Sequence, residues 1–102
     1  MTDIVAEYRN DAELKQLCLK TGITYLAIFG SLARGEEELD SDIDLLYKLK
    51  PGTTYFEFYD IIEQLRDYFK KEIDAVPANH LRDSFRKAIE NEVEVLYEEA
   101  GW

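Results

Sequence analysis

A strongly amphipathic segment runs from about residue 54 to about residue 71 and indicates a helix packed against an apolar surface. Thr54 and Glu57 have the spacing of a capping box, in which the two side chains satisfy backbone N–H groups at a helix start. Apolar residues then recur at steps of three and four: Phe58, Ile61, Ile62, Leu65, Tyr68 and Phe69. The pattern predicts one long helix with a single buried face.

Short runs of β-branched and aromatic residues on both sides of this helix predict strands. Gly30 ends the first run, the turn signal Pro51-Gly52 follows the second, and Pro77 stops the third. The last run alternates between apolar and polar residues, which is typical of a strand with one exposed face. The predicted strands are residues 23–29, 43–49, 72–76 and 93–97.

Two further helices are predicted. The first begins at Asn10, which has Glu13 three residues later, and ends at Gly22, with a preceding turn or two in residues 2–9. The other covers residues 79–91, and its inward-facing residues are expected to be Leu81, Phe85, Ala88 and Ile89. This order predicts a single α+β domain, residues 1–102, in which helices pack on a small mixed β-sheet.

Charge and composition exclude several classes of protein. The chain has 22 acidic and 12 basic residues, a net charge of −10, so it lacks the basic surface of a protein that grips nucleic acid directly. One cysteine, Cys18, cannot form an internal disulfide and is expected to be a buried apolar residue. No membrane-spanning run and no basic leader are visible, so we expect a cytoplasmic protein.

Three aspartates are unusual for their predicted positions. Asp42 and Asp44 lie two residues apart at the head of a strand, so their side chains point to the same face. Asp74 lies within the third predicted strand and joins the pair if the two strands are neighbours. Three adjacent carboxylates raise one another's pKa unless a cation neutralises them, and magnesium takes such hard oxygen ligands.

Other metal or phosphate motifs fail on their spacing. An EF-hand starting at Asp40 would have Leu45 where glycine is required. A P-loop from Gly30 to Gly35 lacks the Lys-Ser/Thr that must follow, and one histidine with one cysteine is too few for zinc. Two interpretations remain open: a phosphoryl- or nucleotidyl-transfer site with a phosphate at Gly30-Ser31, or an acidic strand end without a ligand.

The spacing favours the transfer site. Gly30-Ser31, ten further residues and then Asp42-Ile43-Asp44 resemble the signature of the nucleotidyltransferase superfamily, whose fold is shared with DNA polymerase β. The longer strings GSLARG and SDIDL resemble its minimal nucleotidyltransferase (MNT) branch, and the resemblance extends over nearly the whole chain. It therefore implies a polymerase-β-like fold and a magnesium-dependent nucleotidyltransferase.

The resemblance also implies roles for individual residues. Two magnesium ions would be bound by Asp42 and Asp44, and Asp74 would join the metal site or act as the base on the acceptor hydroxyl. ATP would be the nucleotide donor. Its phosphates would contact three residues of one loop: Gly30, Ser31 and Arg34. For Arg34 the alternative is an ion pair with a nearby glutamate, and His80 is expected on the surface.

The MNT branch includes small-molecule transferases and antitoxins of HEPN ribonuclease toxins. Because this chain leaves no residues for a drug-binding domain, the resemblance implies a type VII antitoxin that transfers AMP to a tyrosine of its HEPN toxin partner and forms a hetero-oligomer with it. The acidic surface suits a basic, RNA-binding partner. The alternatives are an antitoxin that only binds its toxin stoichiometrically, or a small-molecule nucleotidyltransferase.

Overall fold

A computed structural model describes residues 4–36 and 42–99 of the chain. In chain order, its elements are α1 (Ile4–Arg9), α2 (Ala12–Thr21), β1 (Ile23–Phe29), β2 (Ile43–Leu49), α3 (Tyr55–Phe69), β3 (Ile73–Pro77), the 3₁₀ turn η1 (Ala78–His80), α4 (Asp83–Ile89) and β4 (Glu94–Glu98). Within these residues no helix has the length and apolar composition needed to cross a membrane.

The four strands form one mixed sheet in the order β3-β2-β1-β4. Strand β1 pairs antiparallel with both β2 and β4, whereas β2 and β3 are parallel. Parallel strands require a crossover connection, and α3 provides it between β2 and β3. The predicted α+β fold with a mixed sheet is confirmed.

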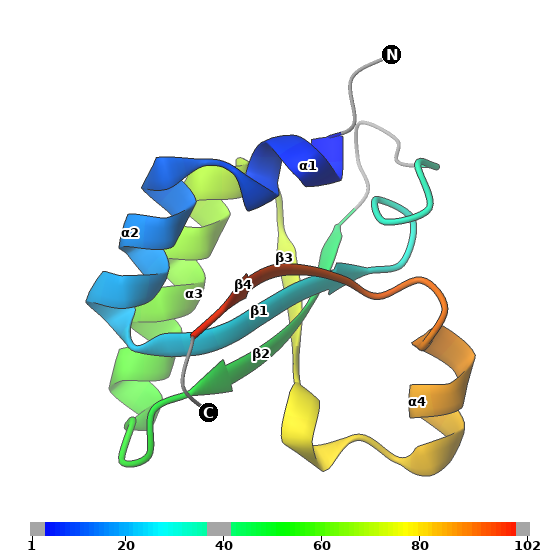
Figure 1. The fold of residues 1–102 in the computed structure, drawn as a ribbon. Coiled ribbons are helices and arrows are strands. Elements are labelled where there is room, and N and C mark those ends of the chain that lie inside the picture. Colours follow the sequence, from blue (N-terminus) through cyan, green and yellow to red (C-terminus); the bar gives the residue numbers. More distant parts are fainter. Residues whose placement is uncertain (1–3, 37–41, 100–102) are drawn as a thin grey trace.

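One face of the sheet carries the main apolar core. Helices α2 and α3 lie side by side over this face, and α1 continues from α2 along the same layer (Figure 1). The core includes Leu14 from α2, Leu26 from β1, Leu45 from β2 and Leu65 from α3, each at most 2% exposed. Cys18 is buried among them as predicted, and burial raises the pKa of its thiol to about 12.

The opposite face is covered less completely. Helix α4 lies on this side, away from α2 and α3 (Figure 1). Its buried Ile89 packs with Ala27 and Phe29 of β1 and Leu46 of β2 in a second, smaller cluster. Because side chains alternate along a strand, Asp44 points to the same side as Leu46. The less covered face therefore carries the candidate site.

Helix ends were predicted partly correctly. The capping box of Thr54 and Glu57 is present at the start of α3. The predicted cap at Asn10 is wrong, because α2 is capped by Asp11, whose side chain accepts the N–H of Glu13 at 3.0 Å. The Asn10 side chain instead donates to the Ala6 carbonyl at the end of α1.

The C-terminal third shows the largest differences from prediction. The expected helix 79–91 is divided into η1 and the shorter α4, and Ala88 is exposed where an inward position was expected. Phe85 is 37% exposed, although its ring packs edge-on against Phe29. Pro77 belongs to β3, which is an edge strand and therefore one of the places in a sheet where proline is tolerated. The last strand begins one residue later than predicted.

Candidate active site

The three aspartates meet where β2 and β3 begin. Asp42 directly precedes β2, and Asp44 is the second residue of that strand. In the parallel register Asp44 lies opposite Asp74, which is the second residue of β3. Parallel neighbours point to the same face, so the condition for Asp74 to join the pair is met. The crossover through α3 brings together residues thirty positions apart.

The environment of Asp44 opposes its ionisation. Burial raises the pKa of the Asp44 carboxyl, and the charges of Asp74 and Asp42 and a hydrogen bond with Asp74 add to this increase. The charge of Arg34 acts in the opposite direction and lowers it. Asp44 is half-buried, whereas Asp42 and Asp74 are exposed. The arrangement is therefore an electrostatically strained cluster that a cation would relieve.

Gly30 lies directly against this cluster. It follows the last residue of β1, and Phe29 pairs with Asp44 across the antiparallel ladder. A Cβ atom at Gly30 would lie 2.2 Å from Asp44 Oδ2, closer than any real contact, and its φ of +79° is in the left-handed region. Only glycine fits here without moving the Asp44 carboxylate.

Gly30→Ala is expected to destabilise the fold by about 1–3 kcal/mol and to reduce activity through displacement of Asp44. Gly52→Ala is the matched control, since Gly52 also has a positive φ of +89° but has no neighbour within 4 Å of the added Cβ. Thermal melts of both variants measure the shared backbone strain. Equal nucleotidyltransferase activity in Gly30→Ala and Gly52→Ala would contradict the displacement of Asp44 by the added Cβ.

The loop after Gly30 is folded back on itself. The Arg34 N–H donates to the Gly30 carbonyl at 3.1 Å, and the Glu36 N–H donates to the Ser31 carbonyl at 2.8 Å. These bonds hold half-buried Ser31 next to Gly30 at the end of β1. A phosphate can approach the backbone closely at Gly30, and the Ser31 hydroxyl beside it can donate a hydrogen bond. A phosphate-binding turn requires both features.

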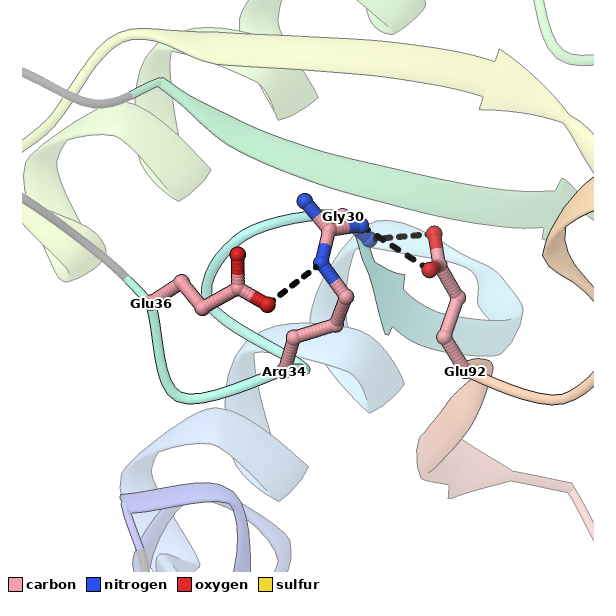
Figure 2. A network of polar contacts seen from close by, with 4 residues as sticks. All are labelled: Gly30, Arg34, Glu36 and Glu92. Carbon is pink, nitrogen blue, oxygen red and sulfur yellow. Dashed lines mark hydrogen bonds and ion pairs between the residues drawn. The ribbon is translucent and has the colours of Figure 1, made fainter.

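Arg34 is held by two carboxylates. Its Nε donates to Glu36 at 3.0 Å and its Nη1 donates to Glu92 at 2.9 Å, while the other terminal nitrogen points away from both (Figure 2). Both bonds raise the pKa of the Arg34 guanidinium, and the bond with Glu92 has the larger effect. The ion pair with a nearby glutamate, which the sequence offered as the alternative role of Arg34, is therefore present.

Glu92 was not predicted as a site residue. Its second carboxylate oxygen accepts the Gly30 N–H at 3.1 Å (Figure 2). Strand pairing would have identified it: Ile28 lies opposite Glu94 in the antiparallel ladder, and extending that register by two residues places residue 92 opposite Gly30. The pairing of β4 with β1 could not be read from the local sequence. His80 lies exposed in η1, as expected.

The donor set fits magnesium as part of a complex with nucleotide. In the part of the chain that the structure describes, no group of three His, Cys, Asp or Glu side chains is arranged to hold a metal ion by itself. Magnesium is usually held by one or two carboxylates together with substrate phosphates, and it rarely occupies an all-protein cage. The adjacent carboxylates of Asp42 and Asp44 can supply that protein share.

Comparison with known proteins identifies relatives in sequence. A family model described as polymerase beta, nucleotidyltransferase matches residues 12–100, a range that includes the loop after β1, the three aspartates and β4. The protein adenylyltransferase MntA of Thermococcus cleftensis is 29% identical over 82 residues, which are 80% of this chain and 83% of that protein.

Solved structures share the fold. A structure of a provisionally identified minimal nucleotidyltransferase is 30% identical, covers 92% of this chain and 95% of that chain, and has a TM-score of 0.71. A complex of a tri-AMPylated HEPN toxin of Shewanella oneidensis with MNT antitoxin is 12% identical, covers 92% and 72%, and has a TM-score of 0.61. The second likeness is one of fold alone.

Proposed function

Because the chain belongs to the polymerase β nucleotidyltransferase family, we propose that it is an antitoxin that transfers AMP from ATP to a tyrosine hydroxyl of a HEPN ribonuclease toxin. One observation carries the proposal: Asp44 and Asp74 face each other across parallel strands, directly beside Gly30. A carboxylate with a raised pKa, Asp44, beside a second carboxylate and a glycine turn suits nucleotidyl transfer.

The proposed reaction is a displacement at the α-phosphorus of ATP. The tyrosine oxygen forms a bond to this phosphorus, the bond to the bridging oxygen of the β-phosphate breaks, and pyrophosphate leaves. Asp74 accepts the proton of the hydroxyl, a role that suits an exposed carboxylate open to a partner protein. Gly30, Ser31 and Arg34 hold the phosphates, with the second terminal nitrogen of Arg34 as donor.

Magnesium is proposed to be bound by Asp42 and Asp44. When bound, it would neutralise the developing charge on the phosphate oxygens. The protein contributes the position of the carboxylates: Asp44 is fixed by two neighbouring strands, whereas Asp42 precedes β2 and is exposed. A bound cation would stabilise the ionised form of Asp44, which burial and the charges of Asp74 and Asp42 disfavour.

The protein acceptor and the toxin rest on the relatives. The Thermococcus cleftensis relative is named a protein adenylyltransferase, and the Shewanella oneidensis complex joins an AMPylated HEPN toxin to an MNT antitoxin. The net charge of −10 supports an interaction with a basic, RNA-binding partner. A stoichiometric antitoxin is the second candidate, because the Shewanella oneidensis structure is a complex of the toxin with its antitoxin.

ATP is expected to bind only together with magnesium or manganese. Asp42 and Asp44 would repel a free triphosphate, so chelation of the metal should weaken binding about tenfold or more. Calorimetric titration of ATP with magnesium and with EDTA measures this difference. Equal affinity under both conditions would contradict the proposed metal-bridged site.

A further inference from the structure

We propose that Glu92 is a positioning residue for the nucleotide: its carboxylate holds Arg34 and the loop 30–36 in the conformation that receives the triphosphate. The inference rests on the proposed nucleotidyltransferase function and adds to it a residue from the far end of the chain. It concerns how the loop is held, because Glu92 itself contacts the loop and not the three aspartates.

The contacts of Glu92 join the two ends of the turn. One oxygen accepts the Gly30 N–H at 3.1 Å, and the other accepts Arg34 Nη1 at 2.9 Å. Gly30 and Arg34 are also joined by their own backbone bond. A single carboxylate thus fixes the turn at its start and its end, and it reaches there from the connection between α4 and β4 (Figure 2).

The two carboxylates that hold Arg34 differ in how far they are buried. The side chain of Glu92 is 21% exposed, whereas that of Glu36 is 63% exposed. Exposed ion pairs contribute little because water screens them and both side chains lose freedom. Glu36 also belongs to the same loop as Arg34, so their pair cannot anchor the loop to the rest of the protein. Glu92 is therefore the anchor.

Holding Arg34 matters because its charge acts on the site. The backbone of Arg34 is bonded to Gly30, and Gly30 lies directly against the Asp44 carboxylate, so the guanidinium belongs to the loop that borders the aspartate cluster. Its second terminal nitrogen points away from Glu36 and Glu92, so among the described residues it can donate to a phosphate without breaking either ion pair (Figure 2). In a chain of net charge −10, a cation held in this position offsets part of the repulsion of a nucleotide.

Glu92→Gln isolates this role. The amide oxygen can still accept the Gly30 N–H, so the melting temperature should stay close to that of the parent, but the amide nitrogen cannot accept from Arg34. Calorimetry with magnesium-ATP and with magnesium-tripolyphosphate should show both affinities falling, on the order of tenfold, because misplaced binding groups lose much of their effect. Glu92→Ala removes both bonds and should lose more.

Glu94→Gln is the matched control. Glu94 lies two residues away, forms an ion pair of 3.1 Å with Arg9 and lies outside the loop. Both glutamine variants remove one negative charge, which by itself should strengthen the binding of an anion. Weaker binding in Glu92→Gln with unchanged or stronger binding in Glu94→Gln therefore supports positioning. Unchanged or stronger binding in Glu92→Gln would overturn it.

A double variant tests the path through Arg34. If Glu92 acts by orienting the guanidinium, Arg34→Ala combined with Glu92→Gln should bind no more weakly than Arg34→Ala alone. Losses that multiply would show that the two residues act independently and would overturn the inference. Failure of the proposed function looks different, because the parent protein itself would then not bind magnesium-ATP.

Discussion

Asp44→Asn is expected to abolish AMP transfer, with a loss on the order of 10³-fold, while the fold remains intact. The substitution keeps the size of the side chain but removes the charge that would hold the metal. Asp44 lies between Asp74 of β3 and Gly30 at the end of β1. Because Gly30 has no side chain, it cannot supply a carboxylate in place of Asp44. Transfer from ATP labelled in its α-phosphate measures the loss.

Stability should change in the opposite direction. The pKa of Asp44 is raised in the folded protein, so its ionised form destabilises the fold at neutral pH. In EDTA, the Asp44→Asn variant should therefore melt at the same or a higher temperature than the parent. This advantage is present above the folded-state pKa and disappears as the pH falls toward the ordinary value of 3.8. Magnesium-ATP should raise the melting temperature of the parent but not that of the Asp44→Asn variant.

Asp67→Asn is the control for this experiment, because Asp67 is an exposed acid on α3, on the other side of the sheet. It should leave both transfer and the effect of magnesium-ATP unchanged. If Asp44→Asn melts well below the parent in EDTA, Asp44 is a structural residue and the proposed site is wrong.

A small amount of this protein is expected to inactivate a large excess of its toxin. Covalent transfer releases each modified toxin, so one molecule can act many times, whereas a binding antitoxin must match the toxin mole for mole. The experiment mixes an excess of a candidate HEPN ribonuclease toxin with this protein, ATP and magnesium. Intact mass of the toxin should show one or more added AMP groups.

Removal of this protein after the reaction completes the test. A modified toxin should stay inactive, and the Asp44→Asn variant should leave the toxin unmodified at every ratio. An unmodified toxin that is inhibited only at equimolar ratio would establish the stoichiometric antitoxin instead. Transfer to a small molecule with no change in the toxin would establish the third alternative.

Local sequence predicted the central elements well. The strands 23–29 and 43–49 have the predicted bounds, and the capping box at Thr54 begins α3. These segments have strong patterns over many residues, so their conformation needs little help from distant contacts. The sequence predicted that Asp44 and Asp74 lie close together if β2 and β3 are adjacent strands. The structure meets this condition.

Short elements and long-range pairs could not be predicted in the same way. Helix α4 has seven residues, and only Ile89 of it is buried, so its bounds depend on packing against Phe29 and Leu46. Asp11 and Asn10 have nearly equal capping preference, and only the structure distinguishes them. Glu92 meets Gly30 across 62 residues of sequence, a contact that no local pattern encodes.

The distance in sequence between Gly30 and Glu92 has a consequence for the order in which the protein becomes competent during synthesis. Strand β4 is the last of the described elements, and it lies at the edge of the sheet beside β1. During synthesis, Gly30, Ser31 and the three aspartates therefore leave the ribosome before Glu92, the residue that anchors the loop 30–36. Docking of β4 then completes the sheet and the loop in the same step, so the site matures together with the fold.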